Sequence, residues 1–280
     1  MLQTGAFVVS LQTSIPSVAE AVKLLYADYP LLESGGFADF HVRLAQPAGI
    51  RRWYRRQVKF YYDGRSHFKP LPLDQAFPMF EWGLNWCVSG LAHSYLIIHA
   101  AVIEKNGKAV ILPAPPGSGK STLCAALVSR GWRLLSDELA MIRLNDGKLV
   151  PLPRPISLKN ASIKIMREYA PQSIMSRAVV DTTKGMVSHM KVPSDSVARS
   201  DELAQPAWIV FPKYTADASV RLKPIPQARA FMRVAENAFN YSQLGEKGFD
   251  VLAGVIDQTL SYDFTYSKLD DAIDVFSKLK

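Results

Sequence analysis

Residues 113–122, PAPPGSGKST, have the residue types of a loop that binds the phosphates of a nucleotide. Gly117 and Gly119 let several backbone N–H groups converge on phosphate oxygens, and a helix that follows favours an anion at its N-terminus. Lys120 supplies a cation for the β- and γ-phosphates, and Ser121 supplies a hydroxyl for magnesium. We therefore predict that the chain binds ATP, or alternatively GTP, together with Mg²⁺.

One position departs from the phosphate-loop pattern G-x-x-x-x-G-K-[ST], because Ala114 stands where the first glycine belongs. An apolar strand before the loop and a helix after it still give the motif its expected context. The predicted nucleotide-binding residues are Ala114, Gly117, Ser118, Gly119, Lys120, Ser121 and Thr122, joined by Lys184 from a later loop.

Two acids, Asp137 and Glu138, follow at the end of the strand after the loop helix. An acidic pair beside a triphosphate costs electrostatic energy unless it holds a cation or moves a proton, and one acid can do each. The alternative is a plain acidic turn. His99 lies in the strand before the loop strand, so adjacent strands would bring it near the phosphates, although a lone histidine in an apolar run can also be a core residue.

The segments around these residues have the patterns of strands and helices. An apolar strand over 95–107 ends at Asn106-Gly107, a strong hairpin signal, and the strand that enters the loop follows it. Downstream we predict a strand–turn–strand over 132–152, a helix in the 160s, a long loop over 177–200, a strand over 206–214, helices over 227–239 and 248–260, a strand over 262–269 and a terminal helix.

The N-terminal region has a different pattern, with a helix over 19–29, strands over 37–46 and 55–64, and a helix over 73–93. We therefore divide the chain into an α+β region over 1–92, which could bind a substrate or partner, and a nucleotide-binding domain over 93–280. The basic residues between Arg51 and Lys59 are interpreted as the solvated face of a strand.

Bulk composition narrows the alternatives. The net charge of +8 favours anionic partners such as nucleotides, but it is too diffuse to indicate nucleic acid. Cys87 and Cys124 are interpreted as buried thiols, which fits a reducing cytoplasm. The stretch from Trp82 to Ile103 lacks charged side chains, and we interpret it as a buried helix and strand, not a membrane span.

The order of His99-Ala100, the GSGKS run at 117–121, Arg130-Gly131 and Leu135–Glu138 resembles the kinase domain of bacterial HPr kinase/phosphorylase. The resemblance is specific over about 95–145. Segments at 153–160, 181–190, 235–245 and 262–270 look like the HPr-kinase-related kinase A subgroup. The resemblance implies an α/β P-loop kinase core related in fold to phosphoenolpyruvate carboxykinase, with a small N-terminal α+β layer.

The resemblance also implies roles for the matching residues. Asp137 matches the general base, His99 matches the histidine that pairs with that acid, and Lys120 matches the phosphate-loop lysine. Glu138 with Ser121 would hold Mg²⁺, with Asp137 beside them. No counterpart of the segment tied to the reverse phosphorylase reaction is present, so the resemblance implies kinase activity alone.

Basic residues in the downstream segments are the remaining candidates for phosphate contacts. Arg154 and Lys159 flank the PRPISLKN segment, and Lys184-Gly185 in the predicted long loop suits a lid that closes over the γ-phosphate. His189 could join that lid. The alternative is a solvated surface loop.

We therefore expect a cytoplasmic phosphotransferase that moves the γ-phosphoryl group of ATP to a Ser or Thr hydroxyl of a peptide or small protein. A small-molecule kinase acting on a sugar or amino acid, and a nucleotide-binding switch without an acceptor, are the alternatives. The resemblance implies a PqqD-like peptide-binding chaperone as a partner. Nucleic acid is not expected as a partner, and the oligomeric state is open.

Overall fold

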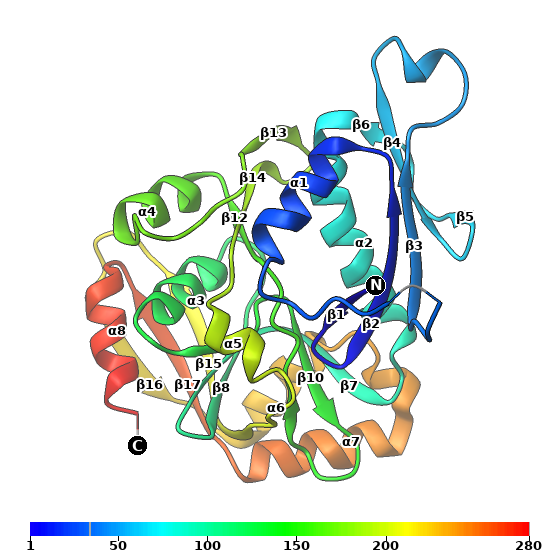
Figure 1. The fold of residues 1–280 in the computed structure, drawn as a ribbon. Coiled ribbons are helices and arrows are strands. Elements are labelled where there is room, and N and C mark those ends of the chain that lie inside the picture. The colour runs from blue at the N-terminus through cyan, green and yellow to red at the C-terminus, as the bar shows by residue number, and fades with distance from the viewer. Residues whose placement is uncertain (34, 280) are drawn as a thin grey trace.

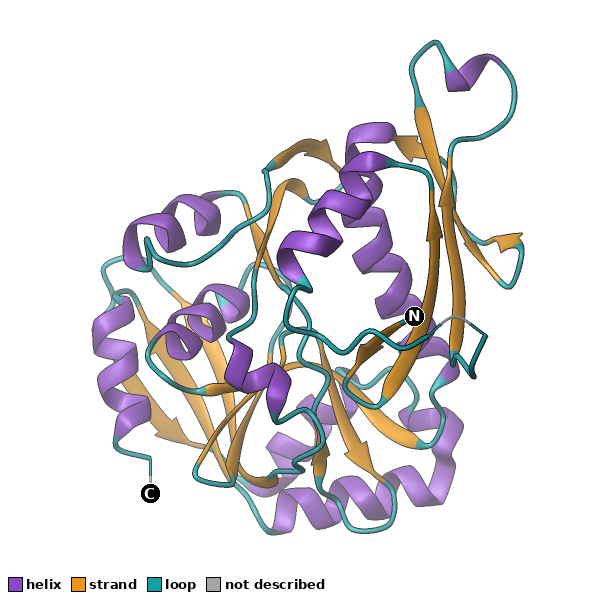
Figure 2. Ribbon diagram, viewed as in Figure 1, coloured by secondary structure: helices purple, strands orange, loops and turns teal. Residues whose placement is uncertain are grey.

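The computed structural model describes residues 1–33 and 35–279, which fold as a mixed α/β protein with three β-sheets (Figures 1 and 2). The central sheet has eight strands, in the order β11-β10-β7-β8-β15-β17-β16 with β9 also paired to β7. Its strands are β7 (Tyr95–Lys105), β8 (Lys108–Pro113), β9 (Arg133–Ser136), β10 (Leu139–Arg143), β11 (Leu149–Val150), β15 (Gln205–Tyr214), β16 (Arg221–Pro224) and β17 (Leu260–Tyr266). Strands β8, β15 and β17 are parallel, whereas β7 runs antiparallel to β8.

Helices cover both faces of this central sheet. They are α3 (Lys120–Ser129) and α8 (Leu269–Ser277) on one face, and α6 (Gln227–Glu236) and α7 (Tyr241–Asp257) on the other. Alternate residues of β7 enter the two cores: Ile97 packs on the α3 side and Ile98 on the α6 side. This two-sided burial explains why the strand is an uninterrupted apolar run in the sequence.

The N-terminal region forms a second sheet that is packed against its own helices. Its elements are β1 (Leu2–Thr4), β2 (Phe7–Thr13), α1 (Pro16–Leu25), β3 (Phe40–Ala45), a 3₁₀ turn (Ile50–Arg52), β4 (Gln57–Tyr62), β5 (Arg65–Ser66), β6 (Leu71–Pro72), a second 3₁₀ turn (Leu73–Gln75) and α2 (Ala76–Leu91). Helix α2 approaches β4 closely, because a Cβ at Gly83 would lie only 2.1 Å from the Phe60 ring. Its other side faces the central domain.

A third, three-stranded sheet consists of β12 (Ile156–Lys159), β14 (Gly185–Met190) and β13 (Val179–Thr182), in that order. Helix α4 (Ala161–Tyr169) follows β12, and the short α5 (Ser194–Ala198) follows β14. The prediction of a long loop over 177–200 is therefore wrong. The polar residues of this segment misled the interpretation, because Ser188 and His189 are buried in β14 beside Val187 and do not face solvent.

Other predictions are confirmed to within a few residues. The hairpin turn at Asn106-Gly107 joins β7 to β8, and the uncharged stretch 82–103 is a buried helix followed by a buried strand. Both cysteines are buried free thiols. The prediction that the basic stretch forms the solvated face of a strand is wrong for residues 51–56. These residues precede β4 and belong to an exposed loop. Among the described residues, no helix has the length and apolar character needed to cross a membrane.

Candidate functional site

The glycine-containing loop joins the end of β8 to the start of α3, as the sequence predicted. Gly117 and Gly119 have φ values of +84° and +89°, which L-residues with a side chain rarely adopt. Helix α3 begins at Lys120 with no side-chain cap. The first N–H groups of the helix therefore remain available for an anion.

Two tyrosines hold this loop in place. The N–H of Tyr214, at the end of β15, donates to the carbonyl oxygen of Ser118 at 2.8 Å. The hydroxyl of Tyr266, at the end of β17, donates to the carbonyl oxygen of Gly119 at 3.0 Å. A Cβ at Gly119 would lie 2.5 Å from that hydroxyl, so a residue larger than glycine does not fit. The parallel strands β15 and β17 thus position the loop.

The remaining predicted loop residues differ in what they contact. Ala114 is buried directly after β8, and Ser118 has a buried hydroxyl without a hydrogen-bond partner. Thr122 is engaged elsewhere, because its hydroxyl lies 2.6 Å from that of Ser162 in α4. The Lys120 side chain is buried, and its Nζ donates to the carbonyl oxygen of Asp137 at 2.5 Å. This bond joins the loop to the acidic pair.

Asp137 and Glu138 occupy the break between β9 and β10. Asp137 is buried; its Oδ2 accepts a hydrogen bond from the Ser157 N–H at 3.1 Å, while its Oδ1 has no partner. Burial raises the pKa of Asp137, and the neighbouring charge of Glu138 adds to this although Lys120 opposes it. The Ser121 hydroxyl is near enough to help lower that pKa.

The acid that pairs with His99 is Glu138. His99 Nε2 lies 3.1 Å from Glu138 Oε2, so the implied pairing of His99 with Asp137 is wrong for this structure. The physical reason is strand register: His99 in β7 lies opposite Leu139 in β10, next to Glu138 along the chain. Burial opposes ionisation of Glu138, but Lys120, His99 and Lys159 outweigh it and lower the pKa of this carboxyl.

Two further lysines lie around this acid pair. Lys159 Nζ is 3.7 Å from Glu138 Oε1. Lys184 occupies the turn between β13 and β14, and its Nζ lies 5.0 Å from the ring centroid of Trp82. Partial burial and the nearby Lys159 and Lys120 lower the pKa of Lys184. Lys184, which we predicted to contact the nucleotide, therefore lies in a hairpin turn and not in the long loop we expected.

Arg154 is not a phosphate contact in this structure. Its guanidinium is buried, with Nη2 2.6 Å from Glu81 Oε2 and Nη1 2.8 Å from Asn85 Oδ1. The Tyr26 hydroxyl donates to the other oxygen of Glu81 at 2.6 Å. Arg154 thus neutralises a buried carboxylate of α2 and joins the N-terminal region to the central domain.

His189 is also not part of a mobile lid. It lies in β14, is almost completely buried, and meets the Phe77 ring edge-on at a centroid distance of 5.1 Å. Burial lowers the pKa of His189 to about 4, with a further contribution from Arg154 that is opposed by Glu81. The side chain is therefore neutral at physiological pH.

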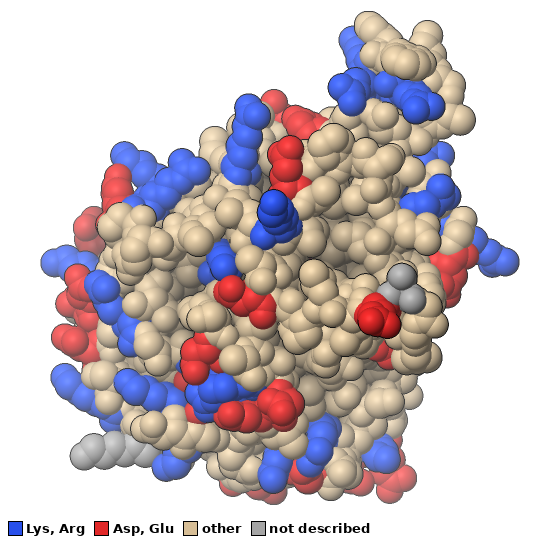
Figure 3. Space-filling view, in the orientation of Figure 1, with Lys and Arg blue, Asp and Glu red and all other residues tan. Residues whose placement is uncertain are grey.

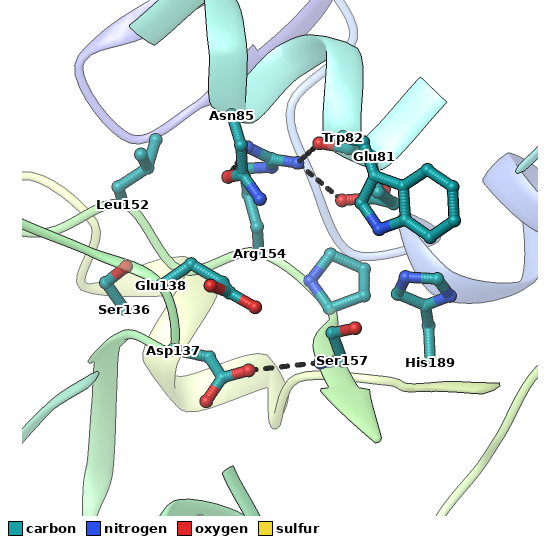
Figure 4. A pocket seen from close by; sticks show the side chains of 11 residues that line it. Glu81, Trp82, Asn85, Ser136, Asp137, Glu138, Leu152, Arg154, Ser157 and His189 are labelled. Carbon is teal, nitrogen blue, oxygen red and sulfur yellow. Dashed lines mark hydrogen bonds and ion pairs between the residues drawn. The ribbon is translucent and has the colours of Figure 1, made fainter. Parts of the chain in front are cut away.

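A small pocket lies between α2, the acid pair and β12 (Figure 4). Asp137 and Glu138 lie across it from Trp82 and His189. Its volume of about 20 Å³ has room for one water-sized group. Five polar atoms of its lining are buried without a hydrogen-bond partner: Trp82 Nε1, Asp137 Oδ1, Arg154 Nε, Ser157 Oγ and His189 Nε2. Because buried polar atoms are normally satisfied, this concentration indicates a place for a polar group.

Sequence reasoning missed the contribution of α2, namely Glu81, Trp82 and Asn85. A signal was present, because Glu81 is the only charged residue between Asp74 and Glu104. A carboxylate in an apolar helix needs a buried cation, which the sequence could have prompted us to seek.

Within the described ranges, no group of three or more His, Cys, Asp and Glu residues is placed to hold a metal by itself. A magnesium ion that binds with a nucleotide needs fewer protein ligands, since phosphates and water supply the others. The unpartnered Oδ1 of Asp137, the adjacent Ser121 hydroxyl and the ionised Glu138 are oxygen donors of the kind that Mg²⁺ prefers. The residues present therefore fit such an ion.

The fold and site define a mixed α/β protein with a strand–glycine loop–helix unit beside an acid pair whose first member, Asp137, is buried. Residues 86–159 are similar to a family described as SynChlorMet cassette protein ScmC. This match spans about a quarter of the chain and includes the end of α2, the glycine loop and the acid pair. No curated protein matched the chain.

Proposed function

We propose that this protein is a kinase with a P-loop core of the HPr-kinase type, which transfers the γ-phosphoryl group of ATP to a Ser or Thr hydroxyl of a peptide or small protein. One observation carries the proposal: Asp137 has a buried carboxylate with an unpaired oxygen, and its main-chain carbonyl oxygen accepts a hydrogen bond from the loop lysine, Lys120. A loop that only bound nucleotide would not require this costly arrangement.

The charges around the site support binding of a triphosphate. Lys120, Lys159 and Lys184 gather around Glu138, and the first turn of α3 presents free N–H groups. Bound Mg²⁺ would neutralise charge on the phosphates, and Ser121 with Glu138 would hold it. His99 would keep the Glu138 carboxylate oriented toward that position.

Asp137 is the residue we assign to accept the proton of the attacking hydroxyl. Its raised pKa makes it a stronger base than an exposed aspartate, and its Oδ1 is free to accept. Ser157 fixes the carboxylate through the hydrogen bond to Oδ2. The base is therefore held rigidly, which supports proton transfer in a defined direction.

The size of the pocket favours a polypeptide acceptor over a sugar or amino acid. Its volume of about 20 Å³ accommodates a hydroxyl group, whereas a site that encloses a small molecule usually has a volume of roughly 300–1,000 Å³. A hydroxyl at the end of a protein side chain can reach such a pocket while the rest of the substrate stays outside.

Transfer of label from γ-labelled ATP tests this proposal, with a peptide library and a panel of sugars and amino acids as acceptors. We expect label on peptides with the wild type. Asp137→Asn should keep nucleotide affinity and lose transfer by about 10²–10⁴-fold, whereas Lys120→Ala should weaken nucleotide binding itself. Full transfer by Asp137→Asn would refute the assignment of the base.

The remaining outcomes separate the alternatives. Label on a small molecule alone would identify a small-molecule kinase. Tight ATP binding by the wild type without transfer to any acceptor would identify a nucleotide-binding switch.

A further inference from the structure

A loop of nine consecutive exposed residues, 48–56, projects from the N-terminal sheet between β3 and β4 (Figure 1). We call residues 46–56 the arginine loop. Its exposed apolar side chains are Ile50, Trp53 and Tyr54, with exposed fractions of 72%, 80% and 61%. Large apolar side chains that are exposed together indicate a surface that another molecule covers. None of these three side chains lines the pocket of the candidate site.

The charge of this region is strongly one-sided. Between Asp39 and Asp63 the sequence has no acidic residue, while it has six cations: Arg43, Arg51, Arg52, Arg55, Arg56 and Lys59. In the space-filling view, Lys and Arg side chains (blue) lie below the tip of this projection, and no Asp or Glu side chain (red) is visible on its face (Figure 3). The partner is therefore expected to be anionic.

Two of the arginines are ordered against aromatic rings. The guanidinium of Arg52 lies 5.7 Å from the Trp53 ring centroid, and that of Arg55 lies 5.6 Å from the Tyr54 ring centroid. These cation–π contacts reduce the freedom that the side chains would lose on binding. Trp, Tyr and Arg are also the residues that contribute most often to protein–protein affinity.

A groove of about 750 Å³ lies between this loop and the body of the protein. We call it the arginine groove. Arg51, Arg55 and Arg56 line it together with Pro72, Leu73 and Asp74. Its volume is in the range of sites that hold a substantial ligand.

We propose that the arginine groove binds an acidic segment of a partner polypeptide, with an apolar side chain of that segment against Trp53. The lining distinguishes this partner from other anions. Asp74 can accept an N–H of a peptide main chain, and a phosphate backbone has no such donor along its length. The groove is concave and partly apolar, a shape that suits an extended segment better than a planar membrane surface. This binding does not depend on phosphoryl transfer.

Fluorescence anisotropy with the full chain, without nucleotide, tests the proposal. The probe is a short fluorescein-labelled peptide of alternating glutamate and leucine residues. We expect saturable binding that weakens with added salt. The triple variant Arg51→Gln, Arg55→Gln, Arg56→Gln should bind about tenfold more weakly, since each exposed pair contributes up to roughly 1 kcal/mol.

A matched triple variant has the same loss of charge on exposed residues outside the groove: Arg167→Gln, Arg221→Gln, Arg229→Gln. It should retain the affinity of the wild type. Trp53→Ser should weaken binding several-fold, while its thermal unfolding midpoint stays the same because the side chain is exposed.

Several results would overturn the proposal. The first is absence of binding of the acidic peptide by the wild type. The second is an equal loss of affinity in the two triple variants, which would indicate a net-charge effect. The third is that a single-stranded oligonucleotide or phosphatidylserine vesicles bind more tightly than the acidic peptide and that the groove variant loses this binding. That result would assign the groove to nucleic acid or to a membrane.

Discussion

His99 and Glu138 form an ion-pair geometry across adjacent antiparallel strands, with 3.1 Å between Nε2 and Oε2. Since the Glu138 carboxyl has a lowered pKa, it is ionised, and the histidine nitrogen donates to it. His99 therefore orients one acid of the pair, while Asp137 is fixed by a backbone N–H from Ser157. The two carboxylates have separate supports and should respond differently to mutation.

The first prediction follows from these separate supports. His99→Ala should raise the Mg²⁺ concentration needed for half-maximal phosphoryl transfer by about 10–100-fold, because loss of a residue that orients a metal ligand costs that much affinity. At saturating Mg²⁺ its rate should return to near that of the wild type. Asp137→Asn should stay inactive at every Mg²⁺ concentration. A rate for His99→Ala that saturating Mg²⁺ does not restore would place His99 in the proton transfer.

The second prediction concerns the buried pair of Glu81 and Arg154. Arg154→Met should lower the free energy of unfolding by about 3–5 kcal/mol, because the Glu81 carboxylate is left buried without its cation. The double variant Glu81→Leu, Arg154→Met should regain a large part of that loss, since it removes both charges. Urea unfolding measures both values.

An exposed pair provides the control for this cycle. Lys164 and Glu168 lie 3.8 Å apart on the surface of α4, so Lys164→Met should leave the urea midpoint nearly unchanged. If the double variant were less stable than Arg154→Met alone, the Arg154 side chain would contribute mainly through packing and not through its charge.

Local features of this protein could be predicted from its sequence, whereas contacts between distant segments could not. The glycine loop and the acid pair could be predicted because each is a short run with its own strand or helix signal. The role of Arg154 could not be predicted, because this residue pairs with Glu81, 73 residues away. A basic residue near a phosphate motif suggests a phosphate contact instead. The partner of His99 depended on the register of β7 and β10, which hydrophobic pattern alone does not specify to one residue.

The third prediction concerns pH. The folded protein holds His189 with a pKa of about 4, whereas an unperturbed histidine has 6.5. Between these values the unfolded chain binds a proton that the folded chain does not, so stability falls as pH decreases from 6.5 to 4. The contribution is about 3 kcal/mol across this window.

Urea unfolding at a series of pH values tests this, with His189→Gln compared to the wild type. The variant should lose less stability between pH 6.5 and 4, whatever its stability at neutral pH. His93→Gln, which alters an exposed histidine, should keep the wild-type slope. Equal slopes for His189→Gln and the wild type would mean that the pKa of His189 is the same in the folded and the unfolded state.

The fourth prediction concerns the loop glycines, which have the same left-handed conformation but different surroundings. A Cβ at Gly119 would lie 2.5 Å from the Tyr266 hydroxyl and 2.9 Å from Tyr214 Cβ, whereas a Cβ at Gly117 would meet no atom within 4 Å. Gly119→Ala should therefore move the loop and weaken ATP binding by at least about tenfold, beyond the cost of about 1 kcal/mol that both variants share for a positive φ. Gly117→Ala has only the shared cost. Tyr266→Phe removes the hydroxyl, and with it the shorter of the two contacts, although the contact with Tyr214 remains. Gly119→Ala combined with Tyr266→Phe should therefore bind ATP more tightly than Gly119→Ala alone. Calorimetric titration with ATP measures the affinities of the wild type, the two alanine variants and the double variant. Equal affinities for the two alanine variants would show that contact with Tyr266 does not position the loop.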